Sequence, residues 1–140
     1  MLDRSPVRSK VDLRFVACEE NECDEPKSAH PYSGVAIEFP DESLDFALVD
    51  GMIRISCMEV VLDQIKPGGL LILDNANRYV PNPFGKGHTT IHEARKAPRS
   101  PRWQAILSRL ESWRAIHTTD GIWDTRFWIK SANHHFANRI

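Results

Sequence analysis

The stretch LDFALVDG, residues 44–51, is an apolar run that ends on an aspartate and a glycine. The nearly continuous apolar character from Leu44 to Val49 predicts a strand buried on both faces, as in parallel sheets. An acid at a strand end is commonly a turn former or a helix cap, because its oxygens accept from free backbone N–H groups. The alternative is that Asp50 and Gly51 lie at a ligand site.

A helix and a second strand are expected directly after this run. Residues 52–66 carry apolar side chains at helical spacing, namely Met58, Val61, Leu62 and Ile65. Pro67-Gly68-Gly69 is expected to stop the helix. Residues 70–73 are all apolar and predict a strand that ends on Asp74 and Asn75. This order of elements predicts a right-handed βαβ unit with parallel strands.

Asp50 and Asp74 are expected at one edge of the sheet, because parallel strands point their carboxyl ends the same way. Open parallel sheets bind ligands at that edge, and two acids at two strand ends are harder to explain as turn formers than one. Arg54 lies in the first turn of the helix, where a cation opposes the helix dipole. It could bind an acidic substrate group, pair with Asp50 or Asp74, or face solvent.

The flanking segments predict shorter elements. Residues 11–18 alternate apolar and polar side chains, which predicts a strand with one buried face. Residues 32–39 fit either helical turns or a short strand. Residues 102–113 predict a second helix. Residues 113–118 and 122–130 predict two strands of an antiparallel hairpin, because an Asp-Gly pair stands between them.

The composition is that of an ordinary globular protein of one domain. The chain has 140 residues, 41% hydrophobic and 26% charged, with a formal net charge of −1. This charge balance argues against a broad basic surface for nucleic acid, and no run approaches the roughly 20 apolar residues of a membrane helix. Three cysteines predict a reducing, cytoplasmic location. We assign residues 1–130 to the domain and residues 131–140 to a polar tail.

The run from Tyr32 to Tyr79 resembles the second half of class I S-adenosylmethionine-dependent methyltransferases. The similarity is carried by DFALVDG at residues 45–51, by KPGGLLILDN at residues 66–75 and by the expected C-terminal hairpin. The first two correspond to the family's fourth and fifth strands. The resemblance implies an α/β fold with an incomplete Rossmann-like methyltransferase sheet, in which a parallel βαβ core precedes an antiparallel hairpin.

Two parts of the family's cofactor site have no counterpart in the sequence. They are the glycine-rich loop after the first strand and the acid that binds the ribose hydroxyls after the second. The resemblance therefore implies the C-terminal part of a methyltransferase domain, truncated at its N-terminus, and weak cofactor binding by this chain alone. A sheet that lacks those strands has an open apolar edge, so we expect a second copy or a partner chain to cover it.

The implied activity is methyl transfer from S-adenosylmethionine to a small-molecule acceptor, without a nucleic-acid or membrane partner. The alternative is a non-catalytic remnant of the fold that acts as a protein interaction module. The site residues that the resemblance implies are Asp50 and Asp74 as catalytic residues, Asp50, Gly51 and Arg54 as cofactor contacts, and Asn75, Arg78 and Tyr79 as acceptor contacts.

Asp74-Asn75 also matches the Asp-Asn pair of the catechol-type O-methyltransferases, which holds a divalent cation together with an acid after the fourth strand. Such oxygen ligands suit Mg²⁺, which would lower the pKa of a bound hydroxyl. The lysine that follows the fourth-strand acid in that class is missing, because residues 51–54 read Gly-Met-Ile-Arg. Bound Mg²⁺ is therefore considered but not expected.

Overall fold

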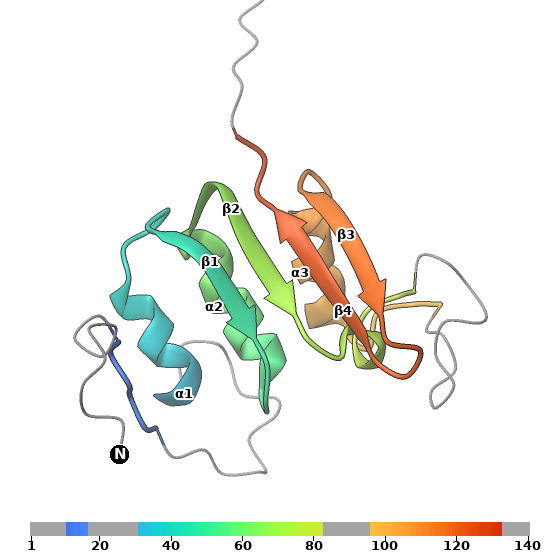
Figure 1. Ribbon diagram of the computed structural model, residues 1–140, viewed down its shortest axis with the longest axis horizontal. Coiled ribbons are helices and arrows are strands. Elements are labelled where there is room, and N and C mark those ends of the chain that lie inside the picture. Colours follow the sequence, from blue (N-terminus) through green and yellow to red (C-terminus); the bar gives the residue numbers. More distant parts are fainter. Residues whose placement is uncertain (1–10, 17–30, 83–95, 133–140) are drawn as a thin grey trace, which may run out of the picture.

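The structure is a computed structural model that describes residues 11–16, 31–82 and 96–132. Its four-stranded mixed sheet has the order β1-β2-β4-β3. Figure 1 shows α2 and α3 on one face of this sheet. The elements are α1 (Pro31–Gly34), η2 (Val35–Glu38), β1 (Leu44–Val49), α2 (Arg54–Gln64), β2 (Ile65–Leu73), η3 (Ala76–Arg78), α3 (Pro101–Leu110), β3 (Arg114–Thr119) and β4 (Asp124–Ile129), with η denoting a 3₁₀ helix.

The predicted βαβ unit is confirmed. β1 and β2 are parallel neighbours, with Val49 opposite Leu73, and α2 connects them. The backbone N–H of Asp74 donates to the carbonyl of Val49 at 3.1 Å. The carboxyl ends of the two strands are therefore hydrogen-bonded to each other, as the site prediction requires.

The hairpin is confirmed as well. β3 and β4 are antiparallel, and β4 adds antiparallel to β2. Residues 31–38 form the helical turns α1 and η2, so the helical alternative holds for this segment. α3 spans residues 101–110, so it begins one residue before the expected range 102–113 and ends three residues before the end of that range. Its start is fixed by Ser100, whose Oγ accepts from the Trp103 backbone N–H at 3.4 Å.

The core lies between the two long helices and the sheet. It is formed by Val49, Leu71, Leu73 and Trp128 of the sheet, by Met58, Val61 and Leu62 of α2, and by Trp103, Ile106 and Leu110 of α3. Full burial of each such side chain stabilises the fold by about 1.5–3 kcal/mol. Arg102 of α3 also donates to both carboxylate oxygens of Glu59 on α2, at 2.9 and 2.6 Å, which fixes the two helices relative to each other.

Two expectations about apolar residues are wrong. Residues 11–16 form no strand, and Leu13 and Phe15 are 91% and 94% exposed; residues 17–18 lie outside the described residues. Burial of β1 on both faces is also wrong, because Phe46 and Leu48 are 65% and 59% exposed. Alternate side chains of a strand point to opposite faces, and α2 and α3 cover only one of them (Figure 1).

Pro67-Gly68-Gly69 has a different position from the one expected. α2 covers residues 54–64 of the expected 52–66 and ends before the triplet, which lies inside β2. There it interrupts the pairing with β1. A Cβ atom on Gly69 would lie 2.8 Å from Ile65 Cγ2, 2.8 Å from the Lys66 carbonyl oxygen and 3.0 Å from the Asp45 carbonyl oxygen. Glycine is therefore required for the close approach of β1 and β2.

We expect Gly69→Ala to destabilise the fold by about 1–3 kcal/mol, because two of the three close atoms belong to the backbone and cannot rotate away. Gly34→Ala is the matched control. Gly34 has φ −61° and an added Cβ there meets nothing within 4 Å. Urea unfolding measures both variants, and equal stabilities of the two would contradict the expectation.

None of the helices in residues 31–82 and 96–132 is long and apolar enough to cross a membrane.

Candidate functional site

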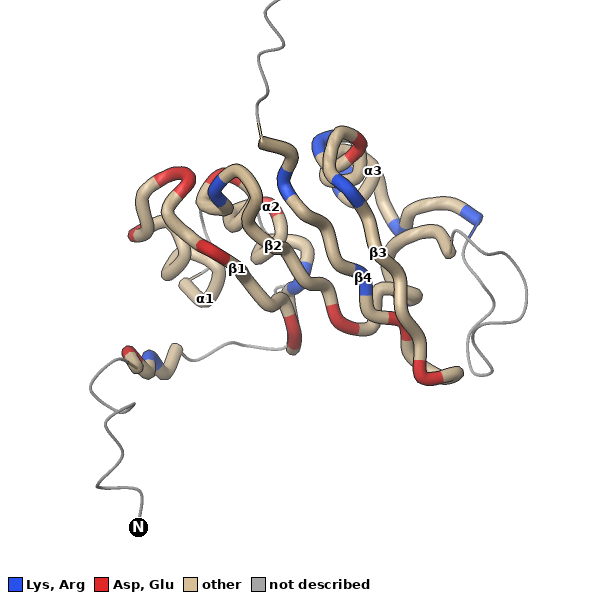
Figure 2. The backbone as a smooth tube through the Cα atoms, turned by 45° about the horizontal axis from the view of Figure 1, so that its top comes forward, with Lys and Arg blue, Asp and Glu red and all other residues tan. Residues whose placement is uncertain are grey.

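Asp50 and Asp74 lie together at the carboxyl ends of β1 and β2, as predicted. Figure 2 shows acidic positions in red where β1 and β2 end, at one edge of the sheet. The Arg54 side chain joins them, because its Nη2 is 2.5 Å from Asp50 Oδ1 and 3.8 Å from Asp74 Oδ2. Nη2 also donates to Asn75 Oδ1 at 3.2 Å, and Nη1 donates to the Tyr79 hydroxyl at 3.1 Å. We call these five residues the rim cluster.

Of the three placements considered for Arg54, the ion pair is confirmed. Its side chain is only 5% exposed, so it has lost most of its hydration and does not face solvent. A buried guanidinium is tolerated only when carboxylates and hydrogen bonds replace the lost water. The rim cluster provides both, which also offsets the unfavourable position of the cation in the first turn of α2.

Hydrogen bonding lowers the pKa of Asp50. The largest cause is the backbone N–H of Gly51, which donates to Asp50 Oδ1 at 2.6 Å, and the Arg54 guanidinium acts in the same direction. Asp50 is therefore ionised at neutral pH and is a poor proton acceptor. Its chemical use is that of a fixed negative charge.

The backbone around the rim cluster adopts positive φ angles. Gly51 has φ +95°, Ile53 has φ +29° and Asn75 has φ +49°. Glycine tolerates this region, but it is rare for a β-branched residue such as Ile53. Strained positions of this kind persist only where the surrounding structure imposes them, and they cluster at functional sites.

The three predicted acceptor contacts after β2 do not lie together. Asn75 and Tyr79 belong to the rim cluster. Arg78 is instead exposed, and its guanidinium lies over the ring of Trp123, 4.5 Å from the ring centroid. Asp74 accepts from the hydroxyl of Thr125 on β4 at 3.1 Å. Asp74 and Thr125 also line a polar cavity of about 340 Å³ between β2 and the hairpin.

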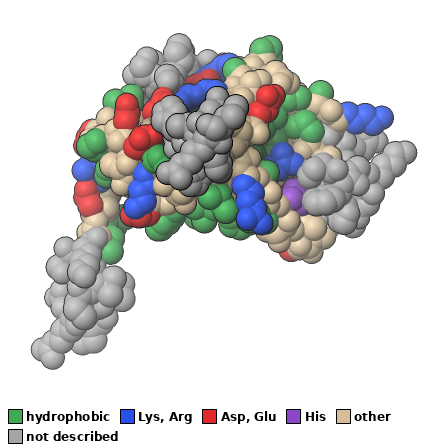
Figure 3. Space-filling model, turned by 90° about the horizontal axis from the view of Figure 1, so that it is seen from above, with side chains coloured by type: hydrophobic (Ala, Val, Ile, Leu, Met, Phe, Trp, Pro, Cys, Tyr) green, Lys and Arg blue, Asp and Glu red, His purple; other side chains and the backbone are tan. Residues whose placement is uncertain are grey.

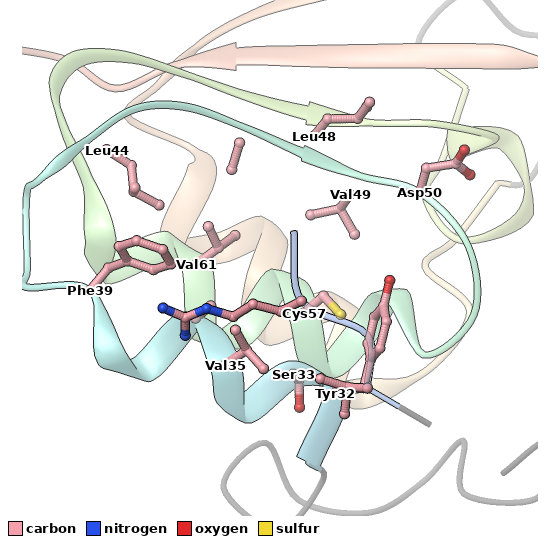
Figure 4. A pocket seen from close by; sticks show the side chains of 14 residues that line it. Tyr32, Ser33, Val35, Phe39, Leu44, Leu48, Val49, Asp50, Cys57 and Val61 are labelled. Carbon is pink, nitrogen blue, oxygen red and sulfur yellow. The ribbon is translucent and has the colours of Figure 1, made fainter. Parts of the chain in front are cut away.

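A mostly apolar cavity of about 340 Å³ lies on the other side of Asp50. It is bounded by α1, η2, β1 and α2, and we call it the α1 cavity. Figure 4 shows Asp50 and the Tyr32 hydroxyl at one end and Phe39 and Leu44 at the other. Gly51 lies beside it, since a Cβ there would be 3.9 Å from the Tyr32 hydroxyl.

Sequence reasoning did not find the α1 cavity. Its walls come from four segments that are separated along the chain, among them residues 14 and 16. No local pattern indicates that these segments meet. The one available signal was the open choice between helix and strand for residues 32–39, since these residues form the helical turns that line one side of the cavity.

The position considered for a divalent cation, between Asp50 and Asp74, is taken by a side chain. Arg54 lies within ion-pair distance of both acids, where a divalent cation shared by them would be bound. Within the described residues, no group of three or more His, Cys, Asp or Glu side chains could hold a metal ion. Elsewhere acidic and basic side chains are interspersed, as the face in Figure 3 shows.

No protein-family model matches the sequence, and no curated protein sequence matches it. Among solved structures, the chain is similar to a possible exported protein from Bordetella parapertussis, with a TM-score of 0.41 and 16% sequence identity. The similarity covers 75% of this chain and 47% of that one, so the chain spans about half the length of that structure.

Proposed function

We propose that the chain is a methyltransferase-like protein that binds S-adenosylmethionine in the α1 cavity and a small acceptor at the rim cluster. One observation carries this proposal: Asp50 belongs to both places, since it lines the α1 cavity and pairs with Arg54. The rim cluster lies at the carboxyl ends of adjacent parallel strands, where open α/β sheets bind ligands, and the α1 cavity reaches this edge at Asp50. The cavity volume of about 340 Å³ is also within the usual range of roughly 300–1,000 Å³ for small-molecule pockets.

The residues of the α1 cavity fit this cofactor. When bound, S-adenosylmethionine supplies a methyl group on a positively charged sulfonium. The apolar walls, including Leu44 and Phe39, suit an adenosyl group. Asp50 is kept ionised by Gly51 and Arg54, so its carboxylate offers a negative charge to a cationic ligand.

The rim cluster provides the polar groups for an acceptor. In methyl transfer to a hydroxyl or amine, the acceptor must lose a proton. Asp74 is better suited than Asp50 to take it, because Asp50 is held by two close donors. Asn75 and Tyr79 complete the wall. The chemistry otherwise asks mainly for positioning of the two reactants.

We expect S-adenosylhomocysteine, the product of the reaction, to raise the unfolding temperature of the full chain. At a free ligand concentration of 100 times Kd, binding stabilises the folded chain by about 2.7 kcal/mol. Phe39→Glu should abolish the shift, because the exposed ring of Phe39 lines the α1 cavity (Figure 4). Phe46→Glu is the matched control: it makes the same change at another exposed phenylalanine, which does not line the cavity.

A folded wild-type chain with no shift at millimolar ligand would refute the proposal, as would an equal loss of the shift in both variants.

A second function, a protein interaction module, is favoured by the uncovered face of the sheet. Phe46, Leu48 and Ile116 are exposed large apolar residues on β1 and β3, and contiguous patches of this kind commonly mark interfaces. β1 is also an edge strand of the described sheet. In sedimentation, a dimer that Phe46→Glu dissociates, together with no response to S-adenosylhomocysteine, would favour this function over methyl transfer.

A further inference from the structure

A third cavity, of about 330 Å³, lies where the N-terminal turns of α2 and α3 meet. It is lined by Ile53, Arg54 and Ile55 at the start of α2, by Tyr79, by Arg99 and Ser100 just before α3, and by Trp103 in its first turn. We call it the Arg99 cavity. It shares Arg54 and Tyr79 with the rim cluster but no residue with the α1 cavity.

Two arginines of this cavity have unused capacity to bind an anion. The exposed Arg99 guanidinium lies over the Tyr79 ring, 5.5 Å from its centroid, and no carboxylate in the described part of the chain is within ion-pair distance of it. Arg54 is 5% exposed, and its Nη atoms are occupied by the rim cluster. Its buried Nε–H, by contrast, has no acceptor among the described residues. An unsatisfied buried donor of this kind is costly unless a bound group accepts from it.

The start of α3 adds a positive potential to the same cavity. Ser100 Oγ accepts from the Trp103 N–H at 3.4 Å, which leaves the hydroxyl hydrogen able to donate. The first turn of this ten-residue helix contains no acidic side chain. The positive end of the helix dipole is therefore not neutralised by a residue of the helix itself.

The remaining walls are apolar. Ile53 and Ile55 line the cavity, and the Trp103 ring, stacked on Tyr79 at a centroid distance of 5.0 Å, closes it. An inorganic anion would leave these walls without a partner. A ligand with both an anionic group and an apolar body would use the arginines and the isoleucines together.

We propose that the Arg99 cavity binds a small carboxylic acid with an apolar body. Arg99 and the Ser100 hydroxyl hold the carboxylate by charge-assisted hydrogen bonds, next to Arg54 Nε, and the apolar body lies against Ile53 and Ile55. The inference does not depend on the methyl-transfer proposal, because Arg99, Ser100, Ile53 and Ile55 belong neither to the α1 cavity nor to the rim cluster.

The test is an NMR titration of the full ¹⁵N-labelled chain with sodium benzoate as the probe. We expect saturable shifts of the Trp103 indole and of the amides of residues 53–55. Benzyl alcohol, which lacks the charge, should bind at least about tenfold more weakly. Arg99→Gln should weaken benzoate binding by about tenfold. Arg114→Gln is the control, because it makes the same charge change at an exposed position outside the cavity.

The absence of saturable shifts would overturn the proposal. Equal affinities for benzoate and benzyl alcohol, or equal effects of the two arginine variants, would overturn it as well. Inorganic phosphate that binds more tightly than benzoate would show a simple anion site and contradict the role of the apolar walls. The spectrum of each variant reports directly whether it is folded.

Discussion

The double variant Asp50→Asn/Asp74→Asn is expected to unfold more easily than the wild type by about 3 kcal/mol. Arg54 is 5% exposed and lies between the two carboxylates. Asparagine keeps a hydrogen-bond acceptor at each position but removes both negative charges. The guanidinium then stays buried without a counter-charge, which is the costly way to break a buried ion pair.

The matched control is Asp41→Asn/Asp45→Asn, which makes the same change in net charge at exposed positions. Asp45 pairs with Lys66 at the surface, and exposed pairs contribute about 0–1 kcal/mol. Arg54→Met should cost less than the double variant, because water reaches the remaining carboxylates. Asp50 and Asp74 are 58% and 33% exposed. Urea unfolding that gives the double variant and its control the same stability would contradict this role of the acids.

The same pair has a defined pH dependence. The folded-state pKa of Asp50 is lowered, first by the Gly51 N–H and then by Arg54. Its contribution to stability is therefore complete above the unfolded-state pKa of about 3.9 and is lost as the pH falls through the folded-state pKa. The stability difference between wild type and Asp50→Asn should be constant from pH 5 to 7 and should narrow below about pH 4. A stability difference between wild type and Asp50→Asn that increases below about pH 4 would contradict a lowered pKa of Asp50 in the folded state.

Trp103→Ala is the second large effect, with an expected cost of about 3–5 kcal/mol. Trp103 is 2% exposed in the core between α3 and the sheet, so truncation leaves a cavity that the neighbours cannot fill. The variant also removes the ring that stacks on Tyr79 at 5.0 Å. The Tyr79 hydroxyl accepts from Arg54 Nη1. Loss of the Trp103 ring should therefore also make the position of Tyr79 in the rim cluster less fixed.

Two further variants separate these contributions of Trp103. Trp103→Phe retains an aromatic ring for Tyr79 and should cost clearly less than the alanine variant. Gln104→Ala changes an exposed neighbour on the same helix and should fall within about 0.5 kcal/mol of wild type. A cost below about 2 kcal/mol for Trp103→Ala would mean that α3 is not docked through this residue.

The parallel pair of β1 and β2 could be predicted because the same local sequence pattern occurs twice. Each strand is an apolar run that ends on an acid, and a helix with one apolar stripe lies between them. These features place Asp50 and Asp74 together without any long-range information. The sequence does not predict whether Arg54 is buried or exposed, because it does not say whether an acid lies near enough to neutralise the guanidinium.

The errors come from patterns whose outcome depends on distant partners. The alternation in residues 11–16 would give a strand only if a sheet edge paired with it, and no strand of the described sheet does so. The apolar run predicts that Phe46 and Leu48 are buried, because strands of this kind are usually covered on both faces. In the structure, α2 and α3 cover only one face of the sheet. The α1 and Arg99 cavities likewise arise from tertiary contacts that no spacing encodes.

The most direct test of the proposed function is a ¹⁵N NMR map of S-adenosylhomocysteine binding to the full chain. We expect saturable shifts at Tyr32 and at residues 48–51, where the α1 cavity meets the rim cluster, and no shifts along β3. Shifts confined to the β3–β4 hairpin, or none at millimolar ligand, would contradict the claim that Asp50 joins a donor cavity to an acceptor site.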